Sequence, residues 1–251
     1  MRKGSDVILG AWHGGLGDQL QLSTLPEEFY KQQGRETYIF EDAPFRNQEI
    51  YDLVWGCNPY IKGKKSGVRN AGDLPEYRIN QTCGNWIQDW EIVHGLVPSN
   101  IRPKIYYPLM KLPNYKNTIL VDLSSVTINH NNTGYGYDLN EVDKIYYALR
   151  KSYPDKKFVG VRFKGVNSNQ HHPKVDEEVV LDNIFHYCHL INSSYGICCF
   201  HSGAMSLGAA IQRSNELLKI YCITPPSVYY SDRTQKQGIF YFDYVDYLVT
   251  E

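Results

Sequence analysis

The chain has 251 residues, of which 42% are hydrophobic and 21% are charged, and its formal net charge is -1. These values are typical of a folded protein with one large or two small domains, and they exclude a disordered chain. A net charge this close to zero provides no overall basic field, so the sequence predicts no nucleic-acid partner.

The first part of the chain alternates short apolar runs with helical patterns, which is typical of a parallel sheet covered by helices. Strands are predicted at 7–11 and 37–40. Between them, apolar residues at helical spacing predict one helix from Gln19 to Gln33, with a kink at Pro26. Gly34 is expected to end this helix, because glycine readily adopts the left-handed conformation of a helix terminus.

Two further helices are predicted at 47–55 and 86–95, before the pattern changes. The segment 97–118 contains four prolines and little periodicity, which is typical of a crossing between domains. We therefore expect a first lobe of residues 1–112 and a second lobe of residues 113–251.

The second part of the chain repeats the alternation of strand and helix patterns. Its predicted strands lie at 118–123, 157–163, 196–200 and 218–223, and its predicted helices at 139–152, 182–191 and 205–211. The predicted fold class is therefore α/β, with two nucleotide-binding-type lobes.

A glycine-rich turn, Gly14 to Asp18, joins the first predicted strand to the helix after it. Such a turn brings bare backbone N–H groups and a helix N-terminus to one place, where phosphate or a developing anion is stabilised. Gly15 and Gly17 would let the backbone approach a ligand closely, and we count Gln19 among the candidate binding residues. A tight turn without a ligand would require the same glycines, so both interpretations stay open.

A second strand-to-helix turn follows the buried strand predicted at 196–200. His201, Ser202, Gly203 and Ala204 form this turn, which offers a hydroxyl and backbone amides at another helix N-terminus. We predict a second binding site here, in which His201 either contacts the ligand or orders the turn.

Two pairs of polar residues follow other predicted strands of the second lobe. Ser124 and Ser125 follow its first strand, at the edge where open α/β sheets bind ligands. Arg162 and Lys164 lie at the end of another strand. They could neutralise a phosphate group, or they could be ordinary solvent-exposed charges.

Several features, taken in order, resemble the ADP-heptose:lipopolysaccharide heptosyltransferase family over nearly the whole chain. They are the opening strand with its Gly-Asp turn, Asn58 to Ile61, the helix Trp86 to Leu96, Arg102 to Lys104 after it, and the pair Ser202-Gly203. The resemblance implies the GT-B architecture: two facing Rossmann-like lobes with parallel sheets, the first for the acceptor and the second for the donor. The family's usual aspartate before the serine-glycine pair and histidine after it are His201 and Ser206 here, so the donor sugar stays open.

The resemblance also implies a reaction. Enzymes of this family move a sugar from a nucleotide-diphosphate sugar to a glycan or glycolipid acceptor, with inversion and without a metal or other cofactor. Their acceptors imply lipopolysaccharide, lipooligosaccharide or capsule as the product here. In such an enzyme the turn around Ser202, together with Ser206, would hold the donor diphosphate.

Asp18 resembles the catalytic aspartate of the family and would act as the general base that removes the proton of the acceptor hydroxyl. A carboxylate at this position could equally well cap its helix. His13 is the competing base, since imidazole titrates near neutral pH, or else it is a hydrogen-bonded structural histidine.

No metal site is expected, because His171 and His172 are adjacent rather than spaced on one helical face. The start of the chain lacks an apolar leader, so we expect a cytoplasmic protein, with contact to the inner face of the membrane as an option. Four basic residues could make that contact or form a solvated loop: Lys62, Lys64, Lys65 and Arg69.

Three other functions stay open. The chain could be another nucleotide-sugar enzyme such as an epimerase, or a non-catalytic binding or assembly subunit of the same architecture. The first glycine-rich turn alone would also suit a Rossmann-type oxidoreductase or methyltransferase, although no complete dinucleotide fingerprint is present.

Overall fold

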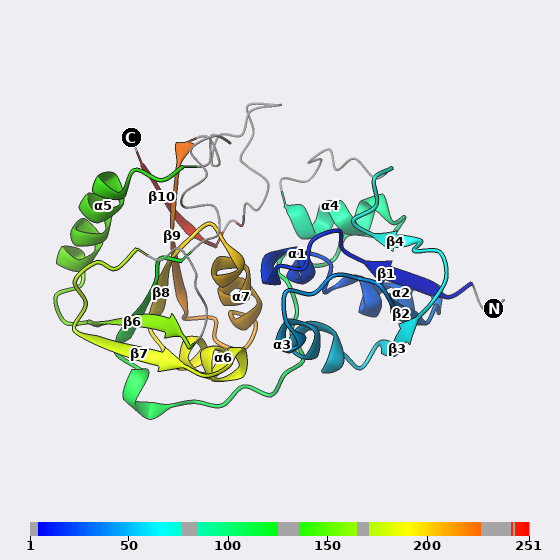
Figure 1. Ribbon diagram of the computed structural model, residues 1–251, viewed down its shortest axis with the longest axis horizontal. Coiled ribbons are helices and arrows are strands. Elements are labelled where there is room, and N and C mark those ends of the chain that lie inside the picture. Colours follow the sequence, from blue (N-terminus) through cyan, green and yellow to red (C-terminus); the bar gives the residue numbers. More distant parts are fainter. Residues whose placement is uncertain are drawn as a thin grey trace. The chain divides into compact units, whose positions relative to one another are not determined.

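The computed structural model describes residues 5–76, 85–124, 136–164, 171–226, 242 and 244–250. The chain forms two compact units, which divide between Pro108 and Leu109. Each unit contains helices and one parallel sheet (Figure 1), so the predicted α/β class is confirmed. The predicted boundary after residue 112 lies a few residues further along the chain.

The sheet of the first unit has four parallel strands in the order β3-β2-β1-β4. Its strands are β1 Val7–Gly10, β2 Thr37–Phe40, β3 Ile61–Lys65 and β4 Ala71–Gly72. The first two match the predicted strands, whereas β3 and β4 were not predicted. β3 and β4 lie on either side of the predicted pair, so the residues that follow them also lie at the carboxyl edge of this sheet.

The helices of the first unit are α1 Leu16–Leu20, α2 Leu25–Gln33, α3 Gln48–Tyr51 and α4 Trp86–Val93, and α3 continues into a π-helical turn, Asp52–Gly56. The single helix predicted from Gln19 to Gln33 is therefore wrong. Pro26 lies in the first turn of α2, where its missing N–H leaves no helical hydrogen bond unmade. Gly34 ends α2 as predicted, with φ at 65°.

The sheet of the second unit has six parallel strands in the order β10-β9-β8-β5-β6-β7. They are β5 Thr118–Asp122, β6 Lys157–Phe163, β7 Glu177–Leu181, β8 Gly196–Phe200, β9 Lys219–Thr224 and β10 Asp246–Val249. Counted along the unit, the first three strands run outward from β5 and the next three run outward from β8. This is the doubly wound order of dinucleotide-binding folds.

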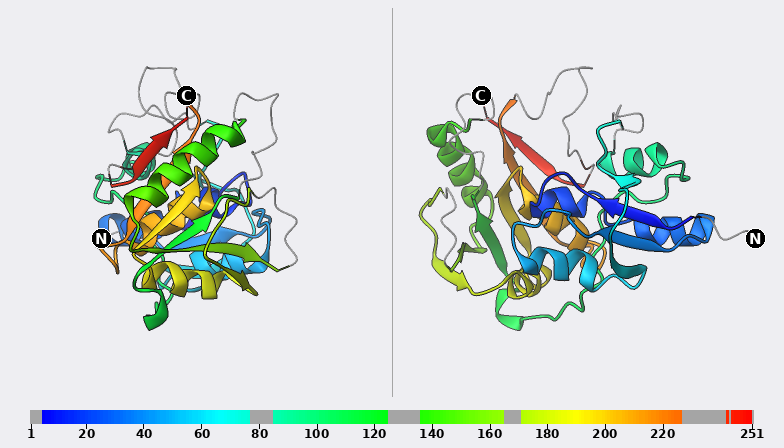
Figure 2. Two further views of the ribbon diagram at one scale, coloured as in Figure 1. Left: turned by 90° about the vertical axis from the view of Figure 1, so that its left-hand side faces the viewer. Right: turned by 45° about the vertical axis from the view of Figure 1, so that its right-hand side comes forward.

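The helices of the second unit are α5 Leu139–Ser152, α6 Ile184–Ser193 and α7 Gly203–Ile211, and a 3-10 turn, Pro113–Tyr115, precedes β5. Figures 1 and 2 show α5 on one face of the sheet and α6 and α7 on the other. Tyr146 of α5 is buried in one cluster with Val121 and Phe158 of the sheet. Gly208 of α7 lies against Ile220 of β9 on the opposite face. Among the described residues, no helix has the length and apolar character needed to cross a membrane.

Candidate functional site

Each sheet reverses its winding direction at one point along its carboxyl edge. In the first unit this point lies between β1 and β4, and in the second it lies between β5 and β8. The loops that follow such a pair of strands diverge to opposite faces of the sheet, and ligands of open α/β sheets bind in the crevice between them. The two predicted turns follow β1 and β8, so each lies at the switch point of its own unit.

The first turn places the carboxylate of Asp18 directly over the backbone of Gly15. Asp18 lies in the first turn of α1, and its Oδ2 accepts a hydrogen bond from the Gly15 N–H at 3.2 Å. A Cβ on Gly15 would lie 2.6 Å from that oxygen, and a Cβ on Gly14 would lie 2.7 Å from the backbone nitrogen of Arg46. Both glycines therefore permit close approaches that a side chain would prevent. Gly17 follows within α1.

The pKa of Asp18 depends on burial and on the groups around its carboxylate. Burial raises the pKa of Asp18, whereas His13, the Gly15 N–H and Arg46 oppose that rise. A carboxylate with a raised pKa accepts a proton more readily, which suits a general base. Asp18 can therefore be both a helix cap and a general base, because one carboxylate oxygen, Oδ2, makes the hydrogen bond to Gly15. His13 is exposed and lies two residues before Gly15.

Gln19, a predicted binding residue, is buried and holds the turn from inside. Its side-chain amide donates to the carbonyl oxygens of His13 at 2.9 Å and Pro44 at 3.2 Å. Its carbonyl oxygen accepts from the indole N–H of Trp55 at 2.8 Å. Because these protein groups occupy both ends of the amide, the structure gives Gln19 a supporting place behind the turn.

Asp73 also lies at this switch point, and the sequence analysis missed it. It follows β4 directly, and its backbone N–H donates to the carbonyl oxygen of Gly10 at 3.2 Å. Burial raises the pKa of Asp73, and so does the charge of Asp18, whereas His13 is among the groups that lower it. The only signal in the sequence was a second Gly-Asp pair, Gly72-Asp73, in a stretch without a strand pattern.

The second turn is a regular helix start at the switch point of the second unit. Ser202 is the N-cap of α7, and its hydroxyl oxygen accepts from the Ala204 N–H at 3.3 Å. The His201 N–H donates to the hydroxyl of Tyr137 at 3.3 Å. Ala204 and Ser206 are buried, whereas the other three are half-buried: His201, Ser202 and Gly203. Of the residues predicted in this turn, a ligand can therefore reach His201, Ser202 and Gly203.

Ser124, at the other side of this switch point, is engaged with a buried acid. Its hydroxyl donates to Oδ1 of Asp122, its backbone N–H bonds the same side chain, and Tyr187 donates to Oδ2 at 2.7 Å. Burial raises the pKa of Asp122, and these hydrogen bonds oppose the rise. Both donors of Ser124 are thus used inside the protein, so a phosphate contact by Ser124 would require breaking one of them. Ser125 lies outside the described residues.

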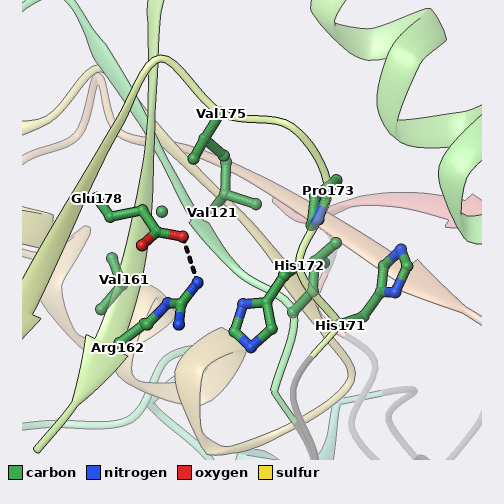
Figure 3. A pocket seen from close by; sticks show the side chains of 10 residues that line it. Val121, Val161, Arg162, His171, His172, Pro173, Val175 and Glu178 are labelled. Atoms are coloured by element: carbon green, nitrogen blue, oxygen red, sulfur yellow. Dashed lines mark hydrogen bonds and ion pairs between the residues drawn. The ribbon is translucent and has the colours of Figure 1, made fainter.

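Arg162 and Lys164 each form an ion pair with an acidic side chain of the second unit. Arg162 pairs with Glu178 of β7 at 2.5 Å, at a small pocket that His172 also lines (Figure 3). Lys164 pairs with Asp182 at 3.5 Å, with both side chains largely exposed. Such exposed pairs stabilise a fold only weakly, so their role as phosphate ligands stays a prediction. In the described parts of the chain, no group of three His, Cys, Asp or Glu residues could hold a metal ion.

The basic residues that were expected in a loop belong mainly to strand β3. Lys65 pairs with Asp6 at 2.5 Å. The ammonium of Lys64 lies 4.7 Å from the centre of the Tyr51 ring, and the guanidinium of Arg69 lies 4.3 Å from that of Trp12. Lys64, Lys65 and Arg69 thus make these contacts with residues of the first unit itself.

Comparison with solved structures found proteins of the same fold. The iron-containing dodecameric glycosyltransferase TibC from enterotoxigenic E. coli H10407 is similar to this chain with a TM-score of 0.60 and 17% identity. That match covers 98% of this chain and 62% of TibC, so this chain spans less than two thirds of TibC. A second structure of TibC, in complex with ADP-D-beta-D-heptose, matches with a TM-score of 0.62 and 15% identity over the same shares.

Two other glycosyltransferases give similar matches. One is a glycosyl transferase of family 9 from Veillonella parvula DSM 2008, with a TM-score of 0.60, 10% identity and coverage of 98% of this chain and 85% of that one. The other is the ADP-heptose lps heptosyltransferase II of E. coli, with a TM-score of 0.55, 9% identity and coverage of 98% of this chain and 90% of that one. The resemblance predicted from the sequence is thus confirmed for the fold. No protein-family model and no curated protein sequence matches the chain.

Proposed function

We propose that the chain is a glycosyltransferase that moves a sugar from a nucleotide-diphosphate sugar to a hydroxyl of a glycan or glycolipid. The observation that carries the proposal is the pair of predicted turns, each found at the switch point of its own sheet, in a fold shared with glycosyltransferases. A TibC structure described with ADP-D-beta-D-heptose supports a nucleotide sugar as the donor. The departures at His201 and Ser206 leave the sugar itself open.

The donor diphosphate would bind at the start of α7. Ser202 caps this helix of nine residues, and the N-terminal end of a helix carries a partial positive charge with backbone N–H groups that suit phosphate oxygens. His201 would add a hydrogen bond or, when protonated, a positive charge. These groups can stabilise the leaving nucleoside diphosphate, so the proposal includes neither a metal ion nor another cofactor. A chelator should then leave the rate unchanged.

The acceptor would be activated by Asp18. In a direct displacement, the acceptor hydroxyl transfers its proton to the Asp18 carboxylate as its oxygen bonds to the anomeric carbon. The bond between that carbon and the diphosphate oxygen breaks, and the nucleoside diphosphate leaves with the electron pair. One such displacement inverts the anomeric centre, and a positioned base contributes about 10²–10⁴-fold to its rate. His13 is the alternative base in the same turn.

The proposal extends to the acceptor and the cellular setting on the resemblance alone. It names a bacterial surface glycan as the acceptor: lipopolysaccharide, lipooligosaccharide or capsule. The enzyme would then work in the cytoplasm, with peripheral contact to the inner face of the membrane. Binding to vesicles of anionic and neutral lipids would test that contact separately from catalysis.

The central test is transfer by the Asp18→Asn variant. The asparagine keeps an oxygen that can accept from the Gly15 N–H, so the fold should persist, while transfer should fall by about 100-fold or more. The assay uses UDP-, GDP-, ADP- and CMP-linked sugars with lipid-linked glycan acceptors, and calorimetry measures donor binding. Asp6→Asn, which removes a carboxylate before β1, is the matched control and should keep the wild-type rate.

Three outcomes would contradict parts of the proposal. Full transfer by Asp18→Asn would remove Asp18 from the role of base and leave His13 as the candidate. Tight binding of a nucleotide sugar without turnover by the wild-type protein would instead identify a non-catalytic subunit. Binding of NAD or S-adenosylmethionine in place of nucleotide sugars would point to the other Rossmann-type functions.

A further inference from the structure

Trp12 is a half-exposed tryptophan on the turn that leads from β1 to Asp18. It lies two residues after the end of β1, and 50% of its surface is exposed, whereas Trp55 and Trp90 are buried. Its place is the carboxyl edge of the first sheet, where open α/β sheets bind ligands. A single exposed apolar residue is common on protein surfaces, so the groups around Trp12 decide what it can do.

One face of the Trp12 ring is covered by the side chain of Arg69. The guanidinium carbon lies 4.3 Å from the centre of the ring, a distance at which a cation is attracted to the face of an indole. Nη1 of the same guanidinium donates to the carbonyl oxygen of Gly10 at 3.4 Å. A Cβ on Gly10 would lie 3.0 Å from Cδ of Arg69. The side chain of Arg69 thus passes closely over the end of β1 and reaches the Trp12 ring from there.

The loop that carries Arg69 is fixed along β1 by its next residue, Asn70. The backbone N–H of Asn70 donates to the carbonyl oxygen of Ile8 at 3.0 Å, and the Ile8 N–H donates to Oδ1 of Asn70 at 2.8 Å. The side-chain amide of Asn70 also donates to the carbonyl oxygen of Asp6 at 3.2 Å. Figure 1 shows the strand after this loop, β4, beside β1. The sheet therefore sets the position of Arg69, and Arg69 holds one face of the Trp12 ring.

The turn beyond Trp12 is closed by hydrogen bonds, so Trp12 stays near Asp18. The buried amide of Gln19 donates to the carbonyl oxygen of His13 at 2.9 Å, and the Gly15 N–H donates to Oδ2 of Asp18 at 3.2 Å. Three residues of chain lead from Trp12 to Gly15, and they span at most about 11 Å. A short glycan whose hydroxyl lies at Asp18 can therefore reach Trp12 with its next sugar.

We propose that Trp12 is a stacking surface for a sugar ring of the acceptor, the ring next to the sugar whose hydroxyl reacts. The face of an indole is electron-rich, so it attracts the partly positive C–H groups on one face of a pyranose. Arg69 covers the opposite face of the indole and acts as a positioning residue for it. Trp12 thereby selects acceptors of at least two sugars. The acceptor role rests on the proposed function, whereas the binding of a sugar to Trp12 does not.

Sugar binding is tested on the wild-type protein by NMR of its indole N–H groups. The chain has four tryptophans, and the signal that is absent in Trp12→Phe belongs to Trp12. The probes are cellotriose, chitotriose and the delipidated core oligosaccharide of a lipooligosaccharide. At least one of them should move the Trp12 signal to saturation and leave the signals of the buried Trp55 and Trp90 in place. A Trp12 signal that none of the three probes moves would overturn the proposal.

Variants show whether the ring itself provides the binding. Trp12→Ala should weaken the affinity for the responding probe by about 10-fold, measured on the signals of the probe, because aromatic stacking on a ring is lost. Trp12→Phe keeps an aromatic face and should retain most of the affinity. The control is Tyr30→Ala on α2, which removes another exposed aromatic side chain, 54% exposed, and should bind as the wild type does. Equal affinities of Trp12→Ala and Tyr30→Ala would contradict stacking on Trp12.

The link to catalysis is read from the separate effects on KM and kcat of sugar transfer. With an acceptor of two or more sugars, Trp12→Ala should raise the KM for the acceptor about 10-fold and leave kcat unchanged, because stacking is equal in the ground and transition states. With a one-sugar acceptor the KM should stay at the wild-type value. An equal rise in KM for both acceptors would overturn the acceptor role. If the wild-type protein transfers no sugar, the proposed function fails, and the NMR titration still decides whether Trp12 binds a sugar.

Discussion

Gly15 and Asp18 form the tightest contact of the first turn, because a single atom on the glycine would collide with the carboxylate. The backbone of Gly15 is extended, with φ at -72°, so alanine can adopt it without strain. The obstacle is therefore the 2.6 Å approach of a Cβ to Oδ2 of Asp18 alone. A Gly15→Ala substitution should displace the carboxylate rather than unfold the turn.

On the proposed function, Gly15→Ala should reduce sugar transfer by about 100-fold, which is the effect of a misplacement of about 1 Å in a catalytic group. Loss of the cap should lower the free energy of unfolding by only about 1 kcal/mol. The control is Gly56→Ala, where a Cβ would meet its nearest neighbour, Asp52, at an ordinary 3.7 Å. Transfer rates and urea unfolding of both variants check this. A Gly15→Ala variant with the wild-type rate would mean that catalysis does not depend on this position of Asp18.

At this scale the sequence could indicate which turns matter, but not what each side chain contacts. The turns that contain Asp18 and Ser202 were predicted from the local pattern, and local geometry is what places these two residues. The role of Asp18 came from the family resemblance. Gln19 and Ser124 were predicted from the same local pattern, yet Gln19 accepts from Trp55, which is remote in sequence. Ser124 donates to Asp122, two residues before it, and that acid is held in turn by Tyr187, which is remote in sequence. Such contacts depend on packing between elements, and the local pattern contains no information on it.

Among the elements, those with a clear apolar pattern were predicted and those at the sheet margins were not. The helix 139–152 and the strand 157–163 were predicted with the bounds that the structure has. The edge strand β3 contains three lysines among its five residues, which reads as a solvated loop, although exposed lysines are common on edge strands. β4 has only two residues, so no periodicity can reveal it. Asp73 was missed for this reason.

The helix α2 is tied to the end of the first unit by an acid cluster. Glu27 is buried and bonded to Lys104, to Lys31 and to the hydroxyl of Tyr106 at 2.8 Å. Burial by itself raises the pKa of Glu27, but these partners outweigh it and lower the pKa to about 2. A carboxylate whose pKa is lowered on folding stabilises the fold above its usual pKa of 4.5, and that stability is lost as the pH falls toward 2.

We therefore expect Glu27→Gln to lower the free energy of unfolding at neutral pH by on the order of 2–3 kcal/mol. The difference from the wild-type protein should shrink as the pH falls from 5 toward 2, because the wild-type carboxyl then becomes protonated as well. Urea unfolding across this pH range measures it, with Glu41→Gln, an exposed acid after β2, as the control. A difference that is the same at all pH values would show that the charge of Glu27 is not what stabilises α2.

On the scale of the whole molecule, the chain contains two sheets that each bury their own apolar residues. The division between Pro108 and Leu109 separates a four-stranded sheet from a six-stranded one. The proline-rich segment predicted this organisation because it interrupts both kinds of periodicity. The strand orders, and hence the two switch points, could not be predicted, since β4, β7 and β10 have little pattern of their own.

Two separate cores should respond separately to a core mutation. Phe158 of β6 is fully buried among the residues that pack between α5 and the second sheet, so Phe158→Ala should destabilise that unit by about 3–5 kcal/mol. Hydrogen exchange followed by mass spectrometry should then show faster exchange in peptides of residues 109–251 and little change in those of 5–108. Val180→Ala, at a side chain 58% exposed on β7, is the control and should change neither set. Equal loss of protection in both units would mean instead that they unfold as one cooperative body, because only coupled units transmit a cavity in one core to the amides of the other.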